Sequence, residues 1–129
     1  MAKQTPISGD EALFQGEDHT FVLTILNAAE TAAIDITTWT LSWMVKRYTS
    51  DADAAALITK TAAASGIVIS GVFNSVPATN TQIATVTLDD TDTTAIGEGL
   101  YHHELKRTDA GFETILAYGA FELVQGVHR

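Results

Sequence analysis

The chain has 129 residues, of which 46% are apolar and 18% charged, and its formal net charge is −9. This length suits one domain with one core, and the apolar content is too high for an intrinsically disordered chain. The negative charge disfavours nucleic acid and anionic membranes as partners, and the absence of cysteine excludes disulfides and thiolate chemistry.

Residues 1–10 are polar, contain Pro6 and Gly9 and show no periodicity. This composition predicts an extended N-terminal arm with no part in the core. The N-terminus lacks the apolar segment of a secretory signal, and no apolar run is long enough to predict a membrane span. We therefore expect an arm at 1–10, one domain at 11–129, and a protein that stays in the compartment where it is made.

From Ala12 onward, apolar and β-branched runs alternate with clusters of small polar residues, a spacing typical of an antiparallel sandwich or barrel. The clearest alternation places Trp39, Leu41, Trp43 and Val45 on one face of a strand. We expect this face to meet the core. The predicted strands are Ala12–Gln15, His19–Asn27, Thr38–Tyr48, Leu57–Thr61, Ile67–Ser70, Gln82–Leu88, Gly99–Arg107 and Phe112–Val124.

Two connecting segments carry further signals. The stretch Asp51–Ala64 can begin a short helix, with Asp51 or Asp53 as its cap. Its later part, Leu57–Thr61, has the composition of a strand, so the stretch remains ambiguous. The sequence Thr108-Asp109-Ala110-Gly111 predicts a short hairpin turn, because Asp and Gly accept positive φ angles.

Candidate metal ligands are few. The run Asp89–Thr94 offers carboxylates and hydroxyls, as calcium prefers, but it lacks the EF-hand spacing and favours a capped helical turn instead. His102 and His103 point to opposite faces of a strand, so we expect one packed and one exposed histidine and no shared metal. His19 and His128 add no recognisable ligand spacing. We predict no metal site.

Catalytic and nucleotide-binding motifs are also lacking. The chain contains no Gly-x-Ser-x-Gly elbow, no Gly-x-Gly-x-x-Gly loop and no Walker loop, and nothing singles out a pair of carboxylates. The basic pairs Lys46-Arg47 and Lys106-Arg107 close predicted strands, where solvation explains them better than an acidic partner does. We predict no catalytic residue, no cofactor and no enzymatic activity.

A further group of residues resembles an immunoglobulin-like fold. Glu98-Gly99-Leu100-Tyr101 opens a strand directly after the acidic helical turn, as at the E–F corner of that fold. The resemblance implies that Tyr101 hydrogen-bonds back to the corner, and that Trp43 or Trp39 is the core tryptophan of strand C. His103 stands where antibody domains have their second cysteine, so only the architecture is shared.

The order of segments is similar to that of small immunoglobulin-like proteins encoded among the structural genes of tailed bacteriophages, and to the N-terminal domain of phage upper-baseplate proteins. The segments include Gly16–Phe21, Ile36–Leu41, Gly66–Ile69 and Gly119–Leu123. The resemblance covers about residues 16–125. It implies an all-β, immunoglobulin-like antiparallel β-sandwich of about 7–8 strands, preceded by the extended arm.

The functional expectation follows from this resemblance. It implies a structural protein of a tailed-phage virion, docked on the capsid or tail as a decoration, neck or baseplate-associated component. Docking is expected through the arm, an exposed strand edge and loops, because exposed edges can accept added strands. The expected partners are other virion proteins and further copies of the chain, without nucleic acid or membrane; synthesis is expected in the host cytoplasm.

The alternative function is a carbohydrate- or host-surface-binding module. For this function, Tyr48, Phe73 and Phe112 would have to lie together on an exposed face of the domain.

Overall fold

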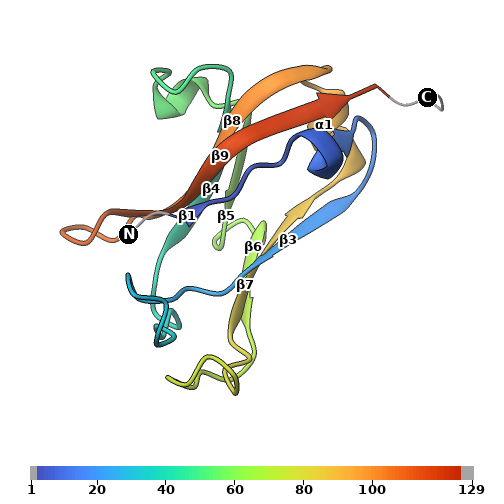
Figure 1. Cartoon of the computed structure of the whole chain (residues 1–129). Coiled ribbons are helices and arrows are strands. Elements are labelled where there is room, and N and C mark those ends of the chain that lie inside the picture. The colour runs from blue at the N-terminus through green and yellow to red at the C-terminus, as the bar shows by residue number, and fades with distance from the viewer. Residues whose placement is uncertain (1–2, 126–129) are drawn as a thin grey trace.

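The computed structural model describes residues 3–125, which form two β-sheets and one short α-helix (Figure 1). The larger sheet has six strands in the order β1-β9-β8-β4-β5, with β2 also paired to β9, and the smaller has the order β3-β7-β6. The predicted all-β class is confirmed, and the architecture is sandwich-like. The strands are β1 Lys3–Gln4, β2 Leu13–Phe14, β3 His19–Leu23, β4 Leu41–Lys46, β5 Ile58–Thr61, β6 Ile67–Ser70, β7 Ile83–Leu88, β8 Gly99–Arg107 and β9 Thr114–Val124.

The helical segments are short. They are the α-helix α1 at Asp90–Thr94 and the 3-10 turns η1 at Gly9–Glu11 and η2 at Asp53–Ala55. Within residues 3–125, no helix has the length and apolar character required to cross a membrane.

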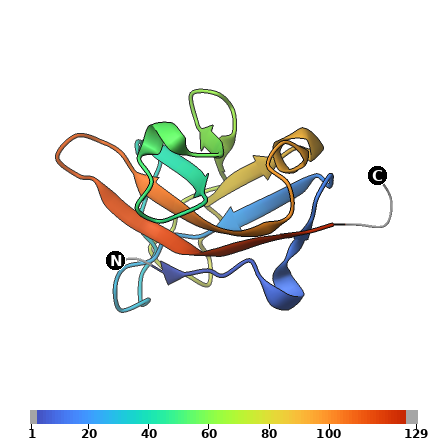
Figure 2. The same ribbon diagram turned by 90° about the horizontal axis from the view of Figure 1, so that it is seen from above.

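The core lies between the two sheets, whose separate layers are visible from above in Figure 2. In β4, alternate residues Leu41, Trp43 and Val45 are buried, as the sequence pattern predicts. Trp43 is 2% exposed, whereas Trp39 is only partly buried at the margin of the core. The smaller sheet contributes a matching set of buried side chains, Ile67, Ala84, Val86 and Leu88.

Most predicted strands are present, with changes at their ends. The strand predicted at Thr38–Tyr48 is shortened to Leu41–Lys46, so the prediction that Trp39 belongs to it is wrong. Ile67–Ser70 and Gly99–Arg107 have the predicted bounds. The strand predicted to reach Asn27 ends at Leu23, because its antiparallel partner β7 begins at Ile83 and pairs Leu23 with Ala84. The ambiguous stretch contains first the 3-10 turn η2 and then β5. The predicted cap is wrong, because the residue at the N-cap of η2 is Ala52, which offers no side-chain hydrogen bond, and not Asp51 or Asp53.

The N-terminal arm lies along the outer edge of β9. In β1, Lys3 and Gln4 pair in parallel with β9, and Ile7 forms a parallel bridge to Phe121. Ile7 is 8% exposed and belongs to the core cluster, so the prediction that the arm takes no part in the core is wrong for this residue. Met1 and Ala2 of the predicted arm lie outside the described residues.

The corner between β7 and β8 contains the predicted tyrosine contact. The Tyr101 hydroxyl donates to the carbonyl of Ile96 at 2.8 Å and lies 3.1 Å from that of Gly97. Its ring is 1% exposed, so the hydroxyl is the polar end of a core side chain that needs a partner. The predicted hydrogen bond from Tyr101 to the corner is confirmed.

Candidate functional site

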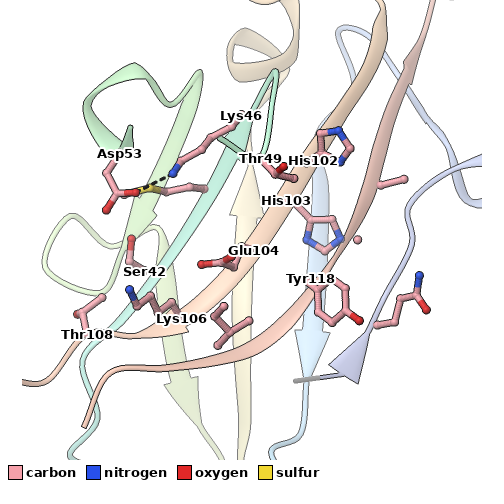
Figure 3. Close-up of a pocket in the computed structure, with 15 residues that line it drawn as sticks. Ser42, Lys46, Thr49, Asp53, His102, His103, Glu104, Lys106, Thr108 and Tyr118 are labelled. Carbon is pink, nitrogen blue, oxygen red and sulfur yellow. Dashed lines mark hydrogen bonds and ion pairs between the residues drawn. The ribbon is translucent and has the colours of Figure 1, made fainter. Parts of the chain in front are cut away.

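The outer face of the larger sheet holds a trough with a volume of about 560 Å³ (Figure 3). Alternate residues of β8 line its floor, namely His102, Glu104 and Lys106. The register places Glu104 between Met44 of β4 and Tyr118 of β9. The centre of the trough therefore combines a carboxylate with a thioether and an aromatic ring.

One end of the trough combines a lysine with a buried hydroxyl group. At this end, Lys106 lies between Ser42 of β4 and Ile115 of β9. A register shift between Leu105 and Lys106 brings Ile115 to the same face as Tyr118, although the two are three residues apart. The Ser42 hydroxyl is buried and has no hydrogen-bond partner among the described residues, so it is an unused polar group at this end.

A loop closes the β4 side of the trough. Lys46 Nζ lies 2.7 Å from Asp53 Oδ1 (Figure 3). It also donates a hydrogen bond to the carbonyl of Asp51 at 3.0 Å, and the two contacts tie the loop to the sheet. The hydrogen bond from Lys46 and its positive charge lower the pKa of Asp53. Glu104 and Lys106 form no ion pair within the described residues, so both charges remain available to a ligand.

The adjacent histidines lie on opposite faces of β8, as predicted. His102 is partly exposed at the trough, whereas His103 is 5% exposed inside the sandwich. Among residues 3–125, no three histidine, aspartate or glutamate side chains are grouped so that they could hold a metal ion. His19 is exposed and packs edge-on against Phe21, and His128 lies outside the described residues.

His103 links the core to the N-terminal arm. Trp43 Nε1 donates to His103 Nδ1 at 3.1 Å, which leaves Nε2–H to donate to the carbonyl of Thr5 at 2.6 Å. Burial lowers the pKa of His103, and the hydrogen bond to Thr5 opposes this effect only in part. The neutral ring is the form that can accept from Trp43 and donate to Thr5 at the same time.

The acidic run forms a capped helical turn, as predicted. Asp92 accepts a hydrogen bond from the backbone N–H of Asp89 at 2.8 Å and pairs with Lys60 Nζ at 2.7 Å. Thr93 Oγ1 accepts from the backbone N–H of Gly16 at 2.9 Å, which fastens the segment between β2 and β3 to α1. These carboxylate and hydroxyl groups therefore serve the fold.

Two of the basic residues expected to be simply solvated are held by the fold instead: Lys46, through its contacts with Asp53 and Asp51, and Arg107. The guanidinium of Arg107 lies 4.2 Å from the ring centroid of Trp39 and 4.9 Å from that of Phe112. Its Nε also donates to Asp109 at 2.8 Å, and this hydrogen bond is the main reason that the pKa of Asp109 falls to about 2. The prediction that solvation explains this residue is wrong, because two aromatic rings and a carboxylate hold the side chain.

The three aromatic residues named for the alternative function do not form one platform. Tyr48 follows the end of β4 at which Lys46 pairs with His102, whereas Phe112 lies beyond the opposite end, where Leu41 pairs with Arg107. Tyr48 and Phe112 are both 62% exposed and stand apart along the sheet. The named aromatic set is therefore wrong, since Tyr48 and Phe112 cannot contact one glycan ring.

Sequence reasoning missed Tyr118 and Gly119, which shape the trough and the arm contact. Both lie in a strand that was predicted, but its faces depend on the irregular register beside Leu105. Gly119, near the middle of the predicted strand, was the available signal, since an isolated glycine in a strand marks a close backbone approach. No protein-family model and no curated protein sequence matches the chain.

Proposed function

We propose that this protein is a non-enzymatic structural component of a tailed-phage virion and docks on the capsid or tail through protein–protein contacts. The observation that carries the proposal is the edge of β9, which binds the extended segment 3–7 by parallel strand addition. Strand addition at an edge is a general means by which β-domains join neighbouring chains.

The order of the strands supports the immunoglobulin-like part of this proposal. In that fold one sheet has strands B, E and D side by side, and the other has G, F and C, extended by C′ in variable-type domains. The smaller sheet follows the first order as β3-β7-β6, and the larger follows the second as β9-β8-β4-β5. The equivalence makes the turn around α1 the E–F corner, where Tyr101 makes its hydrogen bond.

Aromatic packing supports the same assignment at the centre of the sandwich. Where antibody domains have a disulfide against a tryptophan, this chain has Phe21, Trp43 and His103. The ring centroids of Phe21 and Trp43 are 5.6 Å apart, and those of Trp43 and His103 are 5.9 Å apart. A cysteine-free chain can fill the space in this way without relying on an oxidising compartment.

Further contact surfaces are available on the described part of the chain. In the strand order, β5 forms one edge of the larger sheet, and β3 and β6 form the edges of the smaller. On the outer face of the smaller sheet, Val22 and Val68 both lie opposite Thr85 and are 58% and 51% exposed. An edge and an apolar face together suit docking on a large protein surface.

The direct test is to purify particles assembled from the genome that encodes this chain and to quantify the protein by mass spectrometry. We expect a fixed copy number relative to the major capsid or tail protein, retained through a density gradient and a high-salt wash. Dissociated capsids and tails measured separately would locate it. Absence from particles, with the protein abundant in the lysate, would contradict the proposal.

A second candidate function is glycan binding in the trough, favoured by the position of Tyr118 beside Glu104. Tyr118 is 43% exposed and offers a ring for stacking against a sugar, while Glu104 offers an acceptor for sugar hydroxyls. A glycan array tests this function, with Tyr118→Ala as the variant and Tyr48→Ala as the matched control outside the trough. Binding that survives Tyr118→Ala, or no binding at all, would contradict it.

A further inference from the structure

The contacts of the arm define a small acceptor groove on β9. The backbone N–H groups of Thr5 and Ile7 donate to the carbonyls of Tyr118 and Ala120, each at 2.7 Å, and Ile7 accepts from the N–H of Glu122 at 2.7 Å. Pro6, which has no N–H, lies between the two donors, where a parallel strand needs none toward β9. The free backbone groups along this edge of β9 therefore pair with the N–H and carbonyl groups that Thr5 and Ile7 direct toward it.

Two residues of the larger sheet make room for the arm and recognise it. A Cβ atom at Gly119 would lie 3.0 Å from backbone atoms of Thr5 and Pro6, so glycine allows the arm to approach closely. His103 is the register partner of Gly119 on β8, and its side chain reaches the carbonyl of Thr5. The groove thus combines a glycine that admits the arm backbone with a hydrogen-bond donor beside it.

The arm itself is attached by few side chains. Within 3–8, only Ile7 is buried, while Lys3, Gln4 and Pro6 are exposed. The segment is followed by Gly9, which has a positive φ of 60° and no atom within 4 Å of the position of a Cβ. Six extended residues span about 20 Å, enough to reach a neighbouring molecule beside the same edge.

We propose that the groove on β9 also accepts the 3–8 segment of a second copy of this chain, so that neighbouring copies exchange arms. An arm from a second copy makes the same hydrogen bonds and buries the same isoleucine, so exchange changes few contacts. A second copy of the chain is thus a partner in the proposed virion assembly, and this role of the exchange rests on the proposed function. Arm exchange joins copies without requiring a new surface.

Cysteine trapping tests the exchange in the full-length protein, because the natural chain has no cysteine. Gln4 and Tyr118 are exposed register partners, so cysteines at these positions lie at a separation that a disulfide can bridge. One chain carries Gln4→Cys and the other Tyr118→Cys. The second chain is labelled with nitrogen-15, so that mass spectrometry distinguishes mixed dimers from dimers of either variant.

The matched control replaces the second chain by Thr59→Cys, an exposed position on β5 at the opposite edge of the same sheet. We expect mixed dimers of the first pair at a yield at least about tenfold above the control pair, because docking raises the effective thiol concentration. Adding Gly119→Ala to the acceptor chain should reduce this yield, since the methyl group meets the arm. Equal yields from the two pairs would overturn the proposal.

A single chain with both Gln4→Cys and Tyr118→Cys shows whether the positions can be bridged. We expect a disulfide within one chain in dilute solution and a growing share of linked dimers as the protein concentration rises. Failure to form any disulfide would contradict the docking of Gln4 beside Tyr118. Intrachain disulfides alone at all concentrations would contradict the exchange of arms between copies. Absence of the protein from virions would contradict the proposed virion function, whereas the exchange of arms is judged by the yields of mixed dimers.

Discussion

Trp43 donates its indole N–H to Nδ1 of His103 at 3.1 Å, across 60 residues of sequence and between the neighbouring strands β4 and β8. This bond fixes the tautomer of His103, since the other ring nitrogen must then carry the proton that Thr5 accepts. One imidazole therefore joins the central tryptophan of the core to the backbone of the N-terminal arm.

Replacing His103 by alanine should destabilise the protein strongly. The change leaves Trp43 Nε1 buried without its acceptor and the carbonyl of Thr5 without its donor, and it opens space beside Phe121. We expect a loss of about 3 kcal/mol in the free energy of unfolding. Urea denaturation measures it, with His102→Ala as the control on the outer face; equal losses for the two variants would contradict the role of His103.

The stability of the protein should fall as the pH drops below the ordinary pKa of histidine. Burial lowers the pKa of folded His103 from 6.5, and the groups against its ring are Trp43, Phe121 and the Thr5 carbonyl, all uncharged. Above pH 6.5 both states are neutral at this position. Below it, the unfolded chain gains a proton that the folded chain resists, which favours unfolding.

The contribution of neutral His103 to the free energy of unfolding is therefore complete above pH 6.5, and it is lost progressively as the pH falls toward the pKa of the folded state. For this one group, the slope of the free energy of unfolding against pH reaches at most about 1.4 kcal/mol per pH unit. Urea unfolding at pH 8, 6 and 5 measures it, and His103→Phe supplies the comparison, because phenylalanine cannot titrate. The same slope in wild type and His103→Phe would show that another group is responsible.

The arrangement around His103 shows which features follow from sequence alone. Alternation in β4 predicts that Trp43 is buried, since strand periodicity is a local property. The docking of Thr5 and Ile7 on β9 is not predictable in this way, because parallel pairing of a short polar segment leaves no alternation in that segment. Its apolar content is one isoleucine, and its backbone contacts depend on Gly119, more than a hundred residues away.

The trough on the larger sheet illustrates a second limit. The charged face of β8 follows from the alternation of His102, Glu104 and Lys106. Which residues of β9 join this face depends on the register shift beside Leu105, and a shift changes the face on which each later residue lies. Sequence patterning predicted the strand, and tertiary pairing determined which of its side chains line the trough.

Removing the hydroxyl of Tyr101 should test the corner contact without changing the packing of the ring. The Tyr101→Phe variant loses the hydrogen bond to Ile96 and leaves a carbonyl without its donor. We expect a loss of about 1–2 kcal/mol in the free energy of unfolding. Tyr48→Phe is the matched control, because Tyr48 is 62% exposed, and it should change stability little. Indistinguishable midpoints in urea for the two variants would argue against the corner as a stabilising contact.

The hairpin between β8 and β9 should depend on the guanidinium of Arg107 and not on positive charge alone. Lysine at position 107 keeps the charge but loses planar stacking between Trp39 and Phe112 and the Nε hydrogen bond to Asp109. We expect Arg107→Lys to cost about 1 kcal/mol, as estimated for cation–π contacts at partly exposed sites. The neighbouring Lys106→Arg, which faces the trough, is the matched control and should be nearly neutral.

The carboxyl of Asp109 reports the same contact independently of global stability. In the wild type its pKa is lowered to about 2, chiefly by the hydrogen bond from Arg107 and then by that from the backbone of Thr40. The ionised Asp109 carboxylate therefore stabilises the folded state at pH values above its ordinary pKa of 3.8, and this stabilisation is lost as the pH falls toward 2. Carboxyl carbon-13 NMR should find this titration shifted upward in Arg107→Lys and unchanged in Lys106→Arg. No upward shift in Arg107→Lys would mean that positive charge at position 107, and not the geometry of the guanidinium, lowers the pKa of Asp109.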